Sequence, residues 1–301
     1  MKEFLSTAED FVRVALNNGR PNLGKEMAVR IFTDVYFHTW ELSTDARYFI
    51  NGEMVPDMIA GKQRSLGYDG EVMLSGENVV NKGTENIPET GPLLVTPIHY
   101  SGGPINGYGT HLGIAAAVLK RRGEDIKFIL QDSLVNPFTG GRVPATKWIY
   151  EIMTTTYGML RVPPPSLKVA NGEAASMESL KAMIGAFRNG ETVGLYPELT
   201  GTRTVRKGHF LAGMVAKNYL RATRGEGPVL PVGVYEKKGG MRFRFGEPYP
   251  VCEMERFLQR TRDEQEKKKG LKAAANYMMW KINPQVPARM RNSKLDSLFS
   301  A

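Results

Sequence analysis

Hydrophobic and polar residues change their spacing twice along the chain. In residues 1–68 apolar side chains recur at helical spacing, and helical spacing returns in residues 250–283. Between these stretches short apolar runs alternate with amphipathic segments, and Gly, Pro and Asn residues separate them. This alternation predicts strands and helices that follow one another, as they do in layered α/β folds.

The short apolar runs predict the strands of one sheet. They are residues 72–74, 93–98, 127–131, 157–162, 192–197 and 228–234. Residues 241–245 alternate apolar and basic side chains, which predicts an exposed or edge strand. Helices are expected between the strands, at residues 111–120, 142–156, 173–187 and 207–221.

We therefore predict an α/β protein with a single layered domain, whose mixed, mostly parallel sheet is flanked by helices. The change in hydrophobic spacing divides the chain into three parts. Residues 1–69 form a helical N-terminal extension, residues 70–249 form the α/β core, and residues 250–301 form a C-terminal helical segment packed on that core.

Composition places the chain among globular proteins and favours anionic partners. Hydrophobic residues make up 42% of the 301 residues and charged residues 24%. The formal net charge of +9 favours phospholipid or phosphorylated substrates. The basic clusters are short and lack interleaved aromatic residues, so we predict no nucleic-acid partner. Cys252 is the single cysteine, which excludes an intramolecular disulfide and favours a cytoplasmic location.

Membrane contact is predicted to be peripheral, on the inner face of an anionic membrane. No apolar run approaches the ~18 residues that would span a bilayer. Acidic residues stand near the N-terminus where a signal peptide is apolar, so no secretion signal is expected. Residues 25–45 and 277–280 are aromatic-rich and amphipathic. Each is compatible with a membrane-facing helix or with a helix packed in the core.

The most informative stretch is residues 93–109, LLVTPIHYSGGPINGYG. It predicts a buried strand that delivers His99 into a Ser-Gly-Gly turn before a helix. In open α/β sheets, groups at the carboxyl ends of strands face the ligand crevice. A histidine there is a candidate general base, because its ordinary pKa lies near ~6.5. The alternative is a histidine that caps the following helix and has no chemical role.

Four stretches in this order resemble the motifs of the glycerolipid acyltransferases, of the lysophosphatidate and glycerol-3-phosphate acyltransferase type. They read PIHYSGG at residues 97–103, YGMLR at 157–161, GLYPELTGTR at 194–203 and VLPVGV at 229–234. The third is the most specific, since a glycine-bearing strand leads into Tyr-Pro-Glu and then Gly-Thr-Arg. The resemblance covers about residues 70–248.

This resemblance implies acyl transfer from an acyl-thioester, either acyl-CoA or an acyl carrier protein, to a hydroxyl of a glycerol phosphate or lysophospholipid. His99 would deprotonate that hydroxyl, which then attacks the thioester carbonyl. Neither a covalent acyl-enzyme nor a metal is needed, and the thioester is a donor substrate rather than a resident cofactor.

The resemblance also implies roles for residues that would hold the acceptor. Arg161 and Arg203 would bind its phosphate, because guanidinium forks suit phosphate oxygens. Glu198 would orient the acceptor or organise the arginines. Gly201 and Thr202 would let the backbone and a hydroxyl approach the anion. The alternative for the arginines is an ordinary ion pair in the fold.

Ser101 is assigned to the substrate-binding residues of the first motif. It is not a candidate nucleophile, because His-Tyr-Ser is not a Gly-x-Ser-x-Gly elbow and the sequence shows no triad order. The nearby glycines lack dinucleotide spacing, and no Walker-type lysine follows. His111 and His209 are expected to be structural.

The first departure from the family pattern is at Pro104, where the family has an aspartate that orients the histidine. Asp132 or Glu198 would have to replace that carboxylate. If neither does, the chain is a catalytically impaired member of the fold that binds a lipid or acyl-thioester.

The second departure is in the third motif, where Leu199 and Thr200 stand between Pro-Glu and Gly-Thr-Arg. This insertion changes the placement expected for Arg203, and Arg206 or Lys207 would then contact the phosphate. An acyltransferase with a non-phosphate acceptor is the remaining alternative.

Overall fold

The computed structural model describes residues 26, 49–100, 107–131, 144–162, 172–199, 201–259, 261 and 263–299. The chain forms two compact units. The larger consists of Leu66–Phe128 and Met183–Ala301, and the smaller consists of Met1–Ser65 and Ile129–Ala182. Most of the predicted N-terminal helical extension lies outside the described residues, and the division at residues 69/70 and 249/250 stays a prediction.

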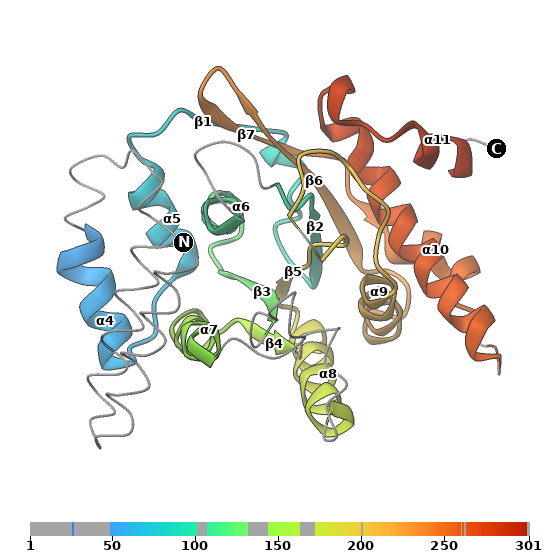
Figure 1. The fold of residues 1–301 in the computed structure, drawn as a ribbon, viewed down its shortest axis with the longest axis horizontal. Coiled ribbons are helices and arrows are strands. Elements are labelled where there is room, and N and C mark those ends of the chain that lie inside the picture. The colour runs from blue at the N-terminus through green and yellow to red at the C-terminus, as the bar shows by residue number, and fades with distance from the viewer. Residues whose placement is uncertain are drawn as a thin grey trace. The chain divides into compact units, whose positions relative to one another are not determined.

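A mixed, mostly parallel sheet forms the centre of the larger unit (Figure 1). Its strand order is β1 (Val79–Lys82), β7 (Gly240–Phe245), β6 (Pro228–Lys237), β2 (Leu93–Pro97), β5 (Thr192–Gly194) and β3 (Ile126–Gln131). Neighbours are parallel except β6 and β7, and the short β8 (Tyr249–Pro250) pairs antiparallel with β6. The predicted α/β class with a mostly parallel sheet is confirmed.

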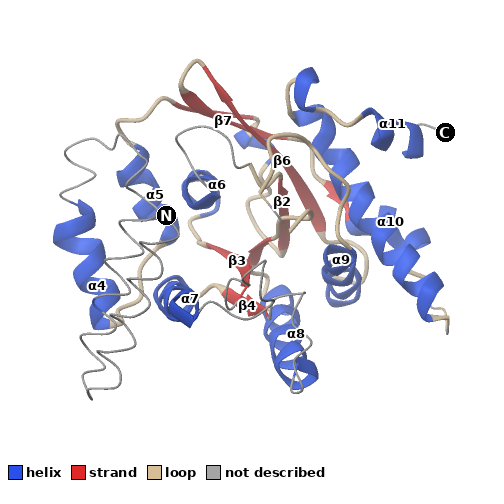
Figure 2. Ribbon diagram, in the orientation of Figure 1, coloured by secondary structure: helices blue, strands red, loops and turns tan. Residues whose placement is uncertain are grey.

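Helices cover both faces of this sheet (Figure 2). One face carries α5 (Leu66–Leu74) and α6 (Gly107–Arg122), and the other carries α9 (Phe210–Ala222) and α10 (Glu264–Ile282). The unit also contains α11 (Ser293–Phe299) and the short 3₁₀ helices η2 (Thr84–Asn86), η3 (Val251–Phe257), η4 (Asn283–Gln285) and η5 (Ala288–Met290). Helix α8 (Gly172–Arg188) begins in the smaller unit and ends in the larger.

The smaller unit is mainly helical among its described residues. It contains η1 (Ile50–Met54), α4 (Val55–Ala60), α7 (Pro144–Tyr157) and the strand β4 (Leu160–Val162). Strand β4 pairs in parallel with Ile129–Gln131, the last residues of β3. This pairing confirms the strand predicted within residues 157–162.

Strand β2 lies inside the sheet because its sequence is apolar on both faces. All five of its residues are buried, as expected for a parallel strand covered by helices on both sides. Its one hydroxyl, that of Thr96, donates to the carbonyl of Leu230 at 3.3 Å. The strand is therefore a fixed support for the residues that follow Pro97.

The strand predicted at residues 72–74 is wrong. These residues form the end of α5, where Met73 and Leu74 are buried. Gly67 and Gly70 in the same helix allow close contact with α6. A three-residue apolar run fits a buried helix as well as a strand, and here the packing against α6 decides.

The edge position predicted for residues 241–245 is also wrong, although the strand itself is confirmed. Strand β7 lies between β1 and β6, and β1 takes the edge. Met241 and Phe243 are buried on the face toward α6, whereas Arg244 is exposed. The alternation of apolar and basic residues therefore indicates a strand with one buried and one exposed face, rather than an edge strand.

The aromatic stretch at residues 277–280 is packed inside the protein. Tyr277, Met278 and Met279 are buried, and the Tyr277 ring contacts Trp280 and Phe299. The membrane-facing role considered for this stretch is therefore wrong, and the core alternative holds. No helix among the described residues is long and apolar enough to cross a membrane.

Replacing Gly70 with Ala should destabilise the larger unit by about 1–3 kcal/mol. The new Cβ would meet the backbone of Leu112 in α6, and backbone atoms cannot rotate away. Urea unfolding measures the change in the free energy of unfolding. Gly185→Ala is the matched control, because a Cβ at Gly185 in α8 meets nothing within 4 Å. The control should be neutral or more stable by up to about 1 kcal/mol, and equal losses in both variants would contradict the packing argument.

Candidate functional site

His99 follows the carboxyl end of β2, and its ring is half-buried against aromatic side chains. The ring centroid lies 4.5 Å from that of Tyr196, at an interplanar angle of 34°. The Tyr196 ring also contacts His111 from α6, at 4.9 Å, and Phe128 from β3, at 5.9 Å. These rings form one cluster in the larger unit. His111 has the packing role that the sequence predicts.

The His99 ring is neutral near pH 7. Burial lowers its pKa to about 4, because a charged imidazolium is poorly solvated among apolar rings. Its Nδ1 is buried and has no hydrogen-bond partner among the described residues. A neutral imidazole keeps a lone pair with which it can accept a proton.

A tight turn presents Glu198 to His99. The amide of Leu199 donates to the carbonyl of Tyr196 at 3.1 Å, and Pro197 takes the second turn position, which proline favours. Leu199 adopts φ 61°, a left-handed conformation that is uncommon for leucine. In this turn the Glu198 carboxylate accepts the backbone N–H of His99 at 3.2 Å.

Burial raises the pKa of Glu198 to about 8, against the opposing effects of the His99 N–H and the nearby Arg206 charge. The second carboxyl oxygen is buried and has no partner in the described part of the chain. Glu198 contacts the main chain of His99 rather than its ring, so it does not replace the orienting aspartate of the family. Asp132 and Pro104 lie outside the described residues.

Thr202 joins the first and third motifs. Its amide donates to the His99 carbonyl at 2.8 Å, and it forms an isolated parallel bridge with Tyr100. Its side chain is buried, and the hydroxyl bonds the backbone of Thr204. The Thr202 amide and hydroxyl both bond to backbone groups of the chain, so Thr202 holds the loop against His99. Its predicted contact with substrate stays a prediction.

Arg203 and Arg289 lie beside Tyr100. Burial raises the pKa of Tyr100, and the positive charges of the two arginines oppose that rise. The amide of Val205 donates to the Met290 carbonyl at 2.8 Å, which brings the C-terminal segment to this loop. Both arginines are exposed, and neither forms an ion pair with another described residue. Their charges are therefore available to an anion.

The other predicted site residues are distributed differently. Gly201 is exposed in the loop before Thr202, and Ser101 lies outside the described residues. Arg161 is half-buried on β4 in the smaller unit. In the part of the chain that the structure describes, no group of three or more His, Cys, Asp or Glu side chains is placed to hold a metal.

Sequence reasoning missed three residues at this site. Tyr196 stands inside the third motif, where its aromatic ring was the available signal. Thr110 bonds the Tyr196 hydroxyl at 2.9 Å, and its neighbour His111 was the nearest signal in the sequence. Arg289 lies far from every motif, so no local pattern indicated it.

Replacing Tyr196 with Phe should lower the free energy of unfolding by about 0.5–1.5 kcal/mol, the usual net contribution of one hydrogen bond. The ring and its contact with His99 remain, while the bond to Thr110 is lost. Tyr196→Ala also removes the buried ring and should cost about 3–5 kcal/mol. Urea unfolding of both variants checks this order. Equal stability of wild type and Tyr196→Phe would show that the hydroxyl contributes nothing.

No protein-family model matches this chain, and no curated protein sequence matches it. Among solved structures, it is similar to the crystal structure of the 1-acyl-sn-glycerophosphate (LPA) acyltransferase PlsC from Thermotoga maritima. The identity is 16%, the match covers 88% of this chain and 98% of that chain, and the TM-score is 0.39.

Proposed function

We propose that this protein transfers a fatty acyl group from an acyl-thioester to a hydroxyl of a glycerol phosphate or lysophospholipid. The observation that carries the proposal is the joining of the first and third motifs at His99. One motif supplies a neutral imidazole. The other supplies Glu198, which accepts the backbone N–H of His99, and the exposed Arg203, which lies beside the neighbouring Tyr100.

In the proposed reaction, His99 accepts the proton of the acceptor hydroxyl while the hydroxyl oxygen attacks the thioester carbonyl. The carbon–sulfur bond then breaks, and His99 returns the proton to the leaving sulfur, which gives an ester and a free thiol. Acyl-CoA and acyl carrier protein are the donors that fit this chemistry. Arg203 and Arg206 hold the phosphate, and the phosphate contact expected of Arg161 stays a prediction.

A transfer assay with labelled acyl-CoA tests the proposal. Lysophosphatidate and glycerol 3-phosphate should give labelled ester, while monoacylglycerol and glycerol should react poorly. Arg203→Gln should raise the KM for the phosphorylated acceptors. Equal use of phosphorylated and neutral acceptors would overturn the phosphate role and favour an acyltransferase with a non-phosphate acceptor.

A second candidate function follows from the buried Nδ1 of His99, which has no carboxylate partner among the described residues. Without an orienting acid, the same site would bind an acyl-thioester or lysolipid without turnover. Tight binding with no product from any donor and acceptor pair would favour this candidate.

Peripheral association with the inner face of an anionic membrane is also part of the proposal. The formal net charge of +9 supports it. Flotation with anionic vesicles at low salt tests it, and no binding would overturn the membrane role while leaving the transfer assay unaffected.

A further inference from the structure

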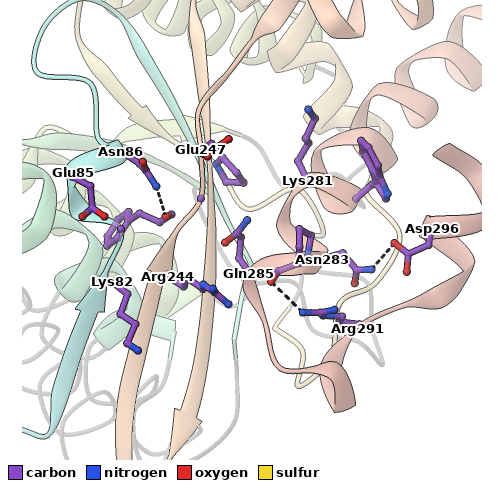
Figure 3. A pocket seen from close by; sticks show the side chains of 16 residues that line it. Lys82, Glu85, Asn86, Arg244, Glu247, Lys281, Asn283, Gln285, Arg291 and Asp296 are labelled. Atoms are coloured by element: carbon purple, nitrogen blue, oxygen red, sulfur yellow. Dashed lines mark hydrogen bonds between the residues drawn. The ribbon is translucent and has the colours of Figure 1, made fainter. Parts of the chain in front are cut away.

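The larger unit has a cavity on the face of the sheet opposite α6. This cavity, of about 810 Å³, lies between the end of β7 and the C-terminal segment (Figure 3). Phe243 faces α6, so the neighbouring Arg244 points to the other face, where Gln285 packs against Gly233. The cavity is therefore separated by the sheet from α6 and its His111.

Lys82 and Arg244 bring two like charges together at this cavity. They are register partners on the parallel strands β1 and β7, and both side chains line the cavity. Like charges directly opposite each other on a sheet are destabilising. Neither side chain forms an ion pair with an acid among the described residues.

Arg291 adds a third cation from the facing side. Its Nε donates to the Val286 carbonyl at 3.1 Å, and a terminal nitrogen donates to the Pro284 carbonyl at 3.4 Å. These bonds fix the guanidinium without neutralising it. Figure 3 shows Arg244 and Arg291 extending from opposite sides of the cavity, with Gln285 near both.

Three acids line the cavity. Asp296 lies on the same side as Arg291 and accepts a hydrogen bond from the Asn283 side chain at 3.1 Å, whereas Glu85 and Glu247 lie apart from the arginine pair. In Figure 3, Glu85 and Glu247 lie above Lys82 and Arg244, toward one end of the cavity. The cavity therefore offers cations and, apart from the arginine pair, the carboxylates of Glu85 and Glu247 as hydrogen-bond acceptors. Its volume is in the range of small-molecule sites, which is ~300–1,000 Å³.

We propose that this cavity binds a small phosphomonoester that carries hydroxyl groups. Lys82, Arg244 and Arg291 hold the phosphoryl group. Its two negative charges suit three cations better than the single negative charge of a carboxylate ligand would. Glu85 and Glu247 accept hydrogen bonds from the hydroxyls. The volume exceeds what inorganic phosphate fills, so the organic part adds affinity. The site does not depend on the proposed acyl transfer.

The test uses the indole N–H signal of Trp280, which lines the cavity. In protein labelled with ¹⁵N-tryptophan, Trp280→Phe identifies this signal. Titration with glycerol 3-phosphate should shift it saturably, and inorganic phosphate should do so with lower affinity. Vesicles that contain phosphatidate separate a lipid headgroup from a free metabolite: a shift with either source supports the site, and no saturable shift with any of these probes overturns it.

Two variants of equal charge change make the assignment specific. Arg244→Gln should weaken binding about tenfold or more, since it removes a charge-assisted contact. Arg242→Gln removes a cation on the same face whose guanidinium donates to the carbonyls of Asn78 and Met241, outside the cavity, so its affinity should stay near wild type. Equal affinity of Arg244→Gln and wild type would overturn the proposal.

Discussion

Replacing His99 with Gln is expected to lower the rate of acyl transfer by about 10²- to 10⁴-fold, the range that a positioned general base supplies. Glutamine fills a similar volume and keeps the backbone N–H that Glu198 accepts, but it cannot take up a proton. The labelled acyl-CoA assay measures the rate, and circular dichroism and urea unfolding show that the variant is folded. Equal rates for variant and wild type would remove His99 from the mechanism.

The pH dependence of acyl transfer is a second test of His99 as the general base. Burial lowers the pKa of His99 to about 4, so the free protein keeps a neutral base at every pH well above that value. In the kcat/KM profile, His99 should therefore cause a loss of activity only as pH falls through about 4, and the phosphate of the acceptor adds its own change near pH ~6. In the complex, the negative phosphate of the acceptor favours the imidazolium, so the acid limb of kcat should lie at higher pH. Titration of the His99 imidazole near pH 6.5 in the free protein, followed by NMR, would contradict the buried, neutral ring.

A result with no product requires a separate interpretation. If folded wild-type protein and His99→Gln both give no ester with any donor and acceptor, the second candidate function gains support. The missing aspartate of the first motif is then the physical reason, since an unoriented imidazole is a poor base. Calorimetric titration with an acyl-thioester would distinguish a binding protein from one that recognises neither substrate.

The sequence predicted the parts of the fold that depend on local pattern. Strand β2 followed from an apolar run, and burial of all five β2 residues confirms that basis. The predicted Ser-Gly-Gly turn lies outside the described residues. Residues 72–74 were misassigned as a strand, and the strand at residues 241–245 was wrongly placed at an edge, because distant partners set their environment. Packing on α6 fixes the first, and pairing with β1 places the second inside the sheet.

The candidate site was predicted only in part, because local motifs do not report contacts between distant segments. His99, Glu198 and Thr202 lie in motifs, and the structure joins them through backbone hydrogen bonds. Arg289 reaches Tyr100 only because residues 205 and 290 meet in the fold, which no local pattern reports. The turn accommodates Leu199 in a left-handed conformation that the sequence alone did not indicate.

Replacing Glu198 with Gln is expected to stabilise the protein by on the order of 3 kcal/mol at pH 7. Burial raises the pKa of Glu198 to about 8 from its ordinary value of 4.5. The folded protein therefore holds a proton that the unfolded chain releases, and the stability from this group is lost as pH rises from about 4.5 through about 8. Glutamine stays neutral in both states and keeps an oxygen that can accept the His99 N–H.

Urea unfolding at several pH values measures this effect. The variant and wild type should differ by less than about 1 kcal/mol at pH 5, and the difference should grow toward pH 8. Glu71→Gln makes the same change of charge at an exposed side chain and should not show this growing difference. Glu198→Ala also removes the acceptor of the His99 N–H, so it should retain less of the gain than glutamine does. A constant difference between Glu198→Gln and wild type from pH 5 to 8 would show that the carboxyl is ionised in the folded protein, with Arg206 compensating its burial.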